Sequence, residues 1–189
     1  EDKLKSCIEG LSQKSAQGRK NSIEGMTKAL SKKFIYDFLI DRKMTVTDPL
    51  MRCLKKGSGD EQALAARCLS LLCLQLGTDI EEDFKDVHSL LLTVLADNSA
   101  TVKGRAECAT TLAISDFLSC SDISVVENTM LALENIFKGS YKKGDKSVPT
   151  HPPAVSKLHA CALSAWSLLI SIAPVFSVKK KIDMHLSKL

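Results

Sequence analysis

Apolar residues recur along this chain at helical spacing, segment after segment, and no segment alternates polar and apolar residues as a half-buried strand does. Leu64, Cys68, Leu72 and Leu76 are each four residues apart and form one apolar stripe on a helix. Residues 90–95 spread apolar side chains over about 200° of a helix, which indicates burial on two sides. This pattern predicts helices that stack on one another and argues against a sheet.

Start and stop signals divide the chain into about ten predicted helices. Ser15 and Asp122 stand where helix N-caps are expected, and Thr47, Asp48 and Pro49 together are typical of a helix start. The predicted helices cover residues 1–11, 16–30, 34–42, 47–56, 60–76, 81–96, 101–118, 123–137, 153–172 and 175–189. Residues 139–153 form a long basic linker between the predicted helices 123–137 and 153–172.

The short links favour antiparallel neighbours. Arg19, Arg67 and Arg105 each stand early in a helix after a polar turn, 48 and 38 residues apart. These spacings are near the ~40–47 residues of armadillo and HEAT repeats. We therefore predict an all-α fold: one armadillo/HEAT-like, right-handed superhelix over residues 1–189, with a helical bundle as the alternative. Because no capping repeats are evident, we expect the chain to be a segment of a longer protein.

The sequence lacks the motifs of common enzyme classes. It contains no glycine-rich nucleotide motif and no HExxH zinc motif. His159 and Cys161 are two residues apart and point to different faces of a helix, unlike paired zinc ligands. His88 and Cys73 have no third group to orient them as a catalytic pair. We expect a non-enzymatic protein with no metal, no cofactor and no small-molecule substrate.

Seven cysteines lie mostly in apolar helical segments. A buried free cysteine behaves as a small hydrophobic residue, and reduced thiols are typical of the cytosol and nucleus. No secretory leader and no uninterrupted apolar run of about 18 residues is evident in the sequence. We expect a cytoplasmic protein, also found in the nucleus, with no membrane partner.

Charge is distributed unevenly behind a net charge of +4. Residues 32–56 carry seven basic and three acidic side chains, and residues 138–189 carry nine and two. Residues 57–137 carry four basic and thirteen acidic side chains. Two basic ends therefore flank an acidic middle, a pattern that informs about partners and orientation rather than about fold.

Three groups of basic residues are candidates for contact with RNA, because Lys and Arg neutralise phosphates and release counterions. Tyr141, within the second group, is a candidate for stacking on an exposed base. The first group is Lys32, Lys33, Arg42, Lys43, Arg52, Lys55 and Lys56; the second is Lys138, Lys142, Lys143 and Lys146; the third is Lys179, Lys180 and Lys181.

Each group has a simpler interpretation. Cations are favoured at helix C-termini by ~0.3–1 kcal/mol, which accounts for the first group. The second group fits a disordered, solvated loop, and the third fits exposed lysines whose aliphatic stems cover apolar surface. A nuclear localisation signal is another use of the third group, although three lysines are a weak form of one. The acidic residues Glu81, Glu82, Asp83 and Asp86 stand at a helix start, where the helix dipole favours them. Docking of a basic tail of a partner protein on them is the alternative.

Several segments, in order along nearly the whole chain, resemble one known family. They are Lys14-Ser-Ala-Gln-Gly-Arg19, residues 35–48, Arg52-Cys-Leu-Lys-Lys-Gly57, Glu61-Gln-Ala-Leu-Ala-Ala66 leading into Leu71-Leu-Cys-Leu-Gln-Leu-Gly77, Arg105-Ala-Glu-Cys-Ala-Thr110, Leu133-Glu-Asn-Ile-Phe137 and Val178-Lys-Lys-Lys-Ile-Asp-Met-His185. Together they resemble the interferon-related developmental regulator family.

The resemblance implies an armadillo-like helical fold and a non-enzymatic regulator of cytoplasm and nucleus. It further implies binding to translationally inactive ribosomes, through rRNA and ribosomal proteins, over the sites of tRNA and mRNA. The alternative that it implies is transcriptional co-regulation with histone deacetylase co-repressor complexes. We therefore predict a regulator that holds rRNA phosphates and sterically blocks the tRNA and mRNA sites.

Overall fold

The computed structural model describes residues 2–57, 59–119, 122–145, 147–172 and 182–188. These residues contain helices and no strand, which confirms the all-α prediction. Residues 182–186 are also helical. The α-helices are α1 (Asp2–Gly10), α2 (Ala16–Leu30), α3 (Tyr36–Ile40), α4 (Lys43–Lys56), α5 (Asp60–Leu76), α6 (Glu81–Ala96), α7 (Val102–Ser119), α8 (Ile123–Phe137) and α9 (Pro153–Ile170), with short 3₁₀ turns η1 (Gly77–Ile80) and η2 (Lys138–Ser140).

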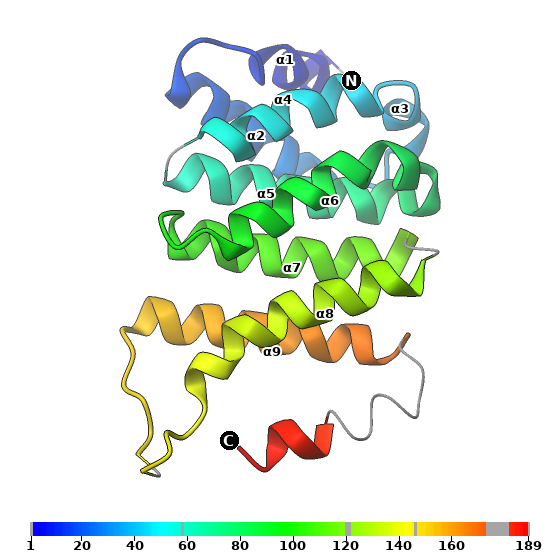
Figure 1. Cartoon of the computed structure of the whole chain (residues 1–189). Helices are drawn as coiled ribbons and strands as arrows, with labels where there is room; N and C mark the ends of the chain where they lie inside the picture. The colour runs from blue at the N-terminus through cyan, green and yellow to red at the C-terminus, as the bar shows by residue number, and fades with distance from the viewer. Residues whose placement is uncertain (1, 58, 120–121, 146, 173–181, 189) are drawn as a thin grey trace.

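The helices form pairs: α1 with α2, α4 with α5, α6 with α7, and α8 with α9. The pairs stack from the N-terminal to the C-terminal end of the chain (Figure 1). One layer holds α2, α5, α7 and α9, each packed against the next. A second layer holds α4, α6 and α8, which pack against α5, α7 and α9, respectively, and lie nearer to the viewer in Figure 1, while α1 packs on α2. This two-layer stack is the arrangement of a helical solenoid.

The second helix of each pair marks the repeat. These helices begin at residues 16, 60, 102 and 153, so that successive starts are 44, 42 and 51 residues apart. The first two intervals match the ~40–47 residues of armadillo and HEAT repeats. The third interval is longer because the link between η2 and α9 is longer than the other links within pairs.

A long polar side chain near the start of each of three second helices fixes the turn before it. Arg19, Gln62 and Arg105 donate hydrogen bonds to backbone carbonyls of the preceding turn or helix at 2.8–2.9 Å. Arg67, which the spacing assigned to this repeat, lies further along α5 and is exposed. That assignment of Arg67 to the repeat is wrong, because the residue of α5 that corresponds to Arg19 and Arg105 is Gln62. A pattern based on arginine does not detect a glutamine at this position.

Four helices, α2, α5, α6 and α8, have the bounds that their capping signals predict. The Ser15 side chain accepts a hydrogen bond from the backbone N–H of Gly18, and the Asp122 side chain accepts one from the N–H of Ser124. Gly77, which ends α5, has φ +55°, a left-handed conformation that glycine adopts without strain. Local capping chemistry therefore sets these ends.

The start of α4 differs from the prediction. The helix begins at Lys43 rather than at Thr47, so that Pro49 lies inside it. An interior proline costs about 3 kcal/mol. Val46, Leu50 and Leu54 are fully buried on one stripe of α4, and burying each such side chain contributes about 1.5–3 kcal/mol. Burial of this stripe outweighs the proline, so the earlier start is the stable one.

Among the other predicted helices, α7 and α9 differ by one or two residues at an end, and two more differ further. α3 covers Tyr36–Ile40, shorter than the predicted 34–42. The predicted helix 175–189 lies partly outside the described residues; within them, residues 182–186 are helical. The apolar spacing of this segment predicts that Leu186 faces inward, but Leu186 is exposed and its neighbour His185 is buried instead.

One apolar core runs through the stack of helix pairs. Two helical stretches, Asp60–Ala96 and Pro153–Ile170, are long and apolar enough by composition to span a membrane. In the fold, Leu69 and Leu72 of α5 and Trp166 and Leu169 of α9 are buried against neighbouring helices. The apolar composition of these stretches therefore supplies core contacts.

Candidate nucleic-acid interface

The turns of the stack gather along two opposite edges (Figure 1). Links within a pair, at residues 11–15, 57 and 59, 97–101, 138–145 and 147–152, lie along one edge, on the left in Figure 1. We call this the intra-pair edge. Links between pairs, which include residues 31–35 and 77–80, lie along the other, the inter-pair edge. Because helix direction alternates, a basic segment of sequence that spans one helix reaches both edges.

Part of the first basic group lies on the intra-pair edge. Arg52, Lys55 and Lys56 are exposed in the last turns of α4. They line a surface hollow of about 380 Å³, and Arg52 and Lys56 also line a second hollow of about 240 Å³ beside it. The end of α4 therefore presents a compact cationic surface.

Lys138, Lys142 and Lys143 of the second basic group belong to the link on the same edge, two pairs further along the stack. Lys142 and Lys143 are exposed in the link that follows η2. The Lys138 ammonium lies 3.4 Å from a carboxylate oxygen of Glu134, so this lysine is already paired. Among the described residues, Lys55, Lys56, Lys142 and Lys143 have no ion-pair partner.

The remainder of the first group lies on the inter-pair edge. Lys32 and Lys33 line a hollow of about 380 Å³ between α1 and α2. The Arg42 guanidinium lies 4.5 Å from the ring centroid of Phe38 and donates a hydrogen bond to the carbonyl of Phe38. Lys43 forms an ion pair with Asp83. Arg42 and Lys43 therefore make intramolecular contacts, and the first group is divided between the two edges.

Tyr141 is partly buried beneath the intra-pair edge. Its hydroxyl is hydrogen-bonded to the imidazole Nδ1 of His185, and its ring packs edge-on against Phe137 with centroids 6.2 Å apart. Burial raises the pKa of the Tyr141 phenol. In this arrangement the ring faces other aromatic residues of the protein. Four further candidates, Lys146, Lys179, Lys180 and Lys181, lie outside the described residues.

A buried polar cluster under the same edge was not predicted from the sequence. The carboxylate of Glu134, only 4% exposed, accepts a hydrogen bond from the indole N–H of Trp166 at 3.1 Å. His185 Nε2 lies 3.5 Å from the same carboxylate oxygen. The cluster attaches residues 182–188 to the last helix pair. Tryptophan at a buried helix position was the one available signal, because its N–H requires a partner.

Ion pairs between the second helices of neighbouring pairs involve other charged residues of the intra-pair edge. Arg19 of α2 pairs with Glu61 of α5, and Lys103 of α7 pairs with Asp60 of α5 at 2.6 Å. The hydrogen bond from Lys103 lowers the pKa of the Asp60 carboxyl. These ion pairs neutralise both acidic residues at the start of α5. Asp60 and Glu61 therefore do not offset the positive charge of the lysines at the end of α4.

Among the cysteines that the structure describes, Cys53, Cys68, Cys73 and Cys108 are buried, and Cys7 and Cys161 are partly buried. Burial raises the pKa of Cys53 to about 11 and the pKa of Cys68 and Cys108 to about 12. Burial also raises the pKa of Cys73. A nucleophilic cysteine needs a lowered pKa, so these thiols have the character of core residues.

His88 contacts an acid rather than a thiol. Its Nε2 lies 3.0 Å from Oδ1 of Asp116 and 3.1 Å from Oγ1 of Thr129. The hydroxyls of the nearby Ser115 and Ser119 donate to backbone carbonyls, so no serine is activated by this histidine. Within the described parts of the chain, no three His, Cys, Asp or Glu side chains are grouped so that they could hold a metal ion.

Comparison with known proteins identifies one family. The family model described as interferon-related developmental regulator matches residues 1–189. The chain is 42% identical over 192 residues to interferon-related developmental regulator 1 of Homo sapiens and 36% identical over 191 residues to interferon-related developmental regulator 2 of Mus musculus. Both alignments cover 100% of this chain, but 42% and 43% of the relatives. The chain thus spans about two-fifths of the length of the curated relatives it matches.

Proposed function

This chain belongs to the interferon-related developmental regulator family, and from that premise we propose that it is a non-enzymatic regulator that binds translationally inactive ribosomes. The proposed contacts are between lysine and arginine side chains of the intra-pair edge and phosphates of rRNA. By occupying space that tRNA or mRNA needs, the bound helical stack would keep the ribosome inactive. The proposed locations are the cytoplasm and also the nucleus.

One observation carries this proposal: exposed cations from two distant parts of the sequence share one edge of the fold. Arg52, Lys55 and Lys56 stand on α4, two helix-to-helix steps from α8 along the stack, and Lys142 and Lys143 follow in the link beyond α8 and η2. At 8–10 Å between neighbouring helices, these steps span roughly 20 Å. A cationic strip of this length matches an extended polyanion better than a small anion.

The core of the stack suits a steric mechanism. Leu69, Leu72 and Leu112 are fully buried between α5, α7 and their neighbours, so the layers move together as one packed body. Contacts to phosphates position such a body without reading sequence. The proposal therefore needs neither bond chemistry nor base recognition by the described residues.

Ribosome binding should weaken steeply with salt. If four lysines each neutralise one phosphate, the affinity should fall about 50–150-fold when monovalent salt rises fourfold at constant magnesium, because each contact releases counterions. Co-sedimentation with vacant ribosomes over that salt range measures the slope. A change in affinity smaller than about threefold would exclude phosphate contacts as the main source of binding.

A second candidate function is a transcriptional co-regulator scaffold that associates with histone deacetylase co-repressor complexes. Exposed apolar side chains on the outer face of the second helices favour a protein partner: Leu74 of α5, Phe117 of α7 and Leu168 of α9. A pulldown from nuclease-treated nuclear extract separates the two functions. Recovery of co-repressor subunits without ribosomes would favour the scaffold, and loss of all partners after nuclease treatment would favour the ribosome.

A further inference from the structure

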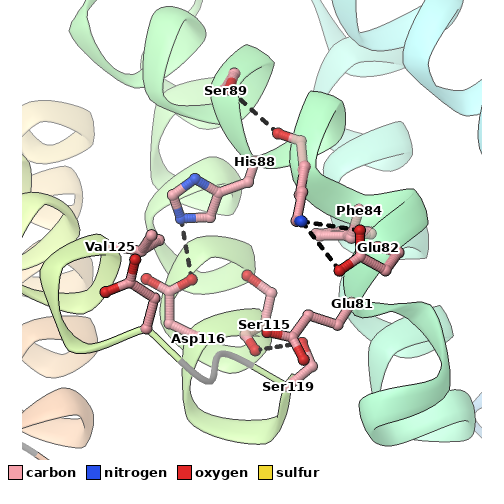
Figure 2. A pocket seen from close by; sticks show the side chains of 11 residues that line it. Glu81, Glu82, Phe84, His88, Ser89, Ser115, Asp116, Ser119 and Val125 are labelled. Atoms are coloured by element: carbon pink, nitrogen blue, oxygen red, sulfur yellow. Dashed lines mark hydrogen bonds and ion pairs between the residues drawn. The ribbon is translucent and has the colours of Figure 1, made fainter.

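A hollow of about 330 Å³, drawn in Figure 2, opens on the inter-pair edge, opposite the edge that carries Lys55, Lys56, Lys142 and Lys143. The start of α6, the second half of α7 and the start of α8 surround it. Four carboxylates line it, with one lysine and one histidine: Glu81, Glu82, Asp116, Asp122, Lys85 and His88. The Lys85 ammonium is already bound to Glu82, at 2.8 and 3.0 Å. The lining is therefore acidic.

Three of these carboxylates have a local explanation. Glu81 and Glu82 stand in the first turn of α6, and Asp122 caps α8. The positive end of the helix dipole favours acids at both places. Their presence in the hollow does not by itself indicate a ligand.

Asp116 has no such explanation. It lies in the C-terminal part of α7, where the helix dipole disfavours a negative charge. Its side chain is 2% exposed and lines the hollow. Oδ1 is held by His88 Nε2 at 3.0 Å, as Figure 2 shows, but Oδ2 has no hydrogen-bond partner among the described residues. A buried carboxylate oxygen is normally paired, so this one points to a missing donor.

The missing donor is best supplied by an organic cation. The described residues around the hollow do not form a group that could hold a metal ion. A guanidinium is planar and presents donors in a fork that matches a carboxylate. Phe84 and Val125 provide apolar surface for the aliphatic stem of an arginine side chain. The size of the hollow accommodates one such side chain.

We propose that this hollow binds an arginine side chain from a basic segment of a partner protein, with Asp116 as the anchoring carboxylate. Glu82, whose side chain is 83% exposed, lies at the rim, and the exposed Asp86 stands one turn further along the same face of α6. These acids would attract basic residues that flank the arginine. An RNA partner is disfavoured here, because the same acids repel phosphate. The proposal is independent of ribosome binding at the other edge.

Peptide binding by the 189-residue chain tests the proposal without ribosomes. The probe is a fluorescein-labelled peptide of arginine and glycine in alternation, compared with versions that carry lysine or citrulline in place of arginine. At low ionic strength, fluorescence anisotropy should show binding of the arginine peptide, weaker binding of the lysine peptide and none of the citrulline peptide. Asp116→Asn should weaken the arginine peptide about tenfold or more, because the anchoring charge is lost.

Two further variants separate anchoring from folding and from net charge. Asp48→Asn removes an exposed carboxylate of α4 outside the hollow and should leave peptide affinity unchanged. Glu82→Gln, at the exposed rim, should leave the thermal midpoint unchanged and weaken binding about threefold. The proposal is overturned if the arginine and citrulline peptides bind alike, if none binds, or if Asp116→Asn and Glu82→Gln both bind as tightly as the unaltered chain.

Discussion

Replacement of Lys55, Lys56, Lys142 and Lys143 by glutamate is expected to abolish ribosome binding. All four side chains are exposed and have no ion-pair partner within the described parts of the chain. The variant loses four phosphate contacts and gains four repulsive charges, so affinity should fall by more than about 100-fold. Co-sedimentation with vacant ribosomes at fixed, low salt measures the loss.

A variant of the same charge change on the opposite edge is the matched control. Lys3, Lys28, Lys32 and Lys33 line one hollow of the inter-pair edge, and their replacement by glutamate should leave most ribosome binding in place. Both variants should keep the helical circular dichroism spectrum of the unaltered chain. Equal losses in the two variants would mean that net charge, not the intra-pair edge, determines binding, and undiminished binding by the first variant would remove its lysines from the interface.

Replacement of Gln75 by alanine is expected to cause a large loss of stability. Gln75 is buried at the end of α5, and its amide nitrogen donates to the carbonyls of Leu30 and Lys33 at 2.9 and 2.8 Å. Its amide oxygen accepts a hydrogen bond from the backbone N–H of Ile35 at 2.8 Å. Without this side chain, three backbone groups between α2 and α3 lose their partner, which should cost about 3 kcal/mol.

Urea unfolding followed by circular dichroism measures that cost, which corresponds to a thermal midpoint lower by about 6–12 °C. Gln17→Ala is the control, because Gln17 is exposed on α2 and bonds only to the side chain of Asn21 among the described residues. We expect the control to change stability by less than about 0.5 kcal/mol. Equal effects of the two variants would show that the Gln75 hydrogen bonds do not stabilise the link between α2 and α3.

Helix bounds were predictable where a local signal decides them. Ser15, Asp122 and Gly77 cap or end their helices through contacts with residues a few positions away, and the bounds of α2, α5 and α8 follow from the sequence. The start of α4 was not predictable in this way. Val46 is fully buried in the fold, and no short-range pattern shows that this burial outweighs the proline at position 49.

The candidate interface was predictable in composition but not in arrangement. Lys33 and Lys55 are close in sequence, yet α4, 14 residues long, separates them by roughly 20 Å at 1.5 Å per residue. Grouping by sequence therefore joined residues of opposite edges. His88 of α6 and Asp116 of α7 are paired although they are 28 positions apart in the sequence. No pattern near either residue predicts this contact.

Lysine footprinting of the chain, free and bound to vacant ribosomes, tests the central claim most directly. An amine-reactive reagent and mass spectrometry report the reactivity of each lysine in both states. We expect protection of Lys55, Lys56, Lys142 and Lys143 on binding, with Lys28 and Lys32 as reactive as in the free chain. Protection of the inter-pair lysines alone, or no protection at the ends of α4 and α8, would contradict the claim that the intra-pair edge contacts the ribosome.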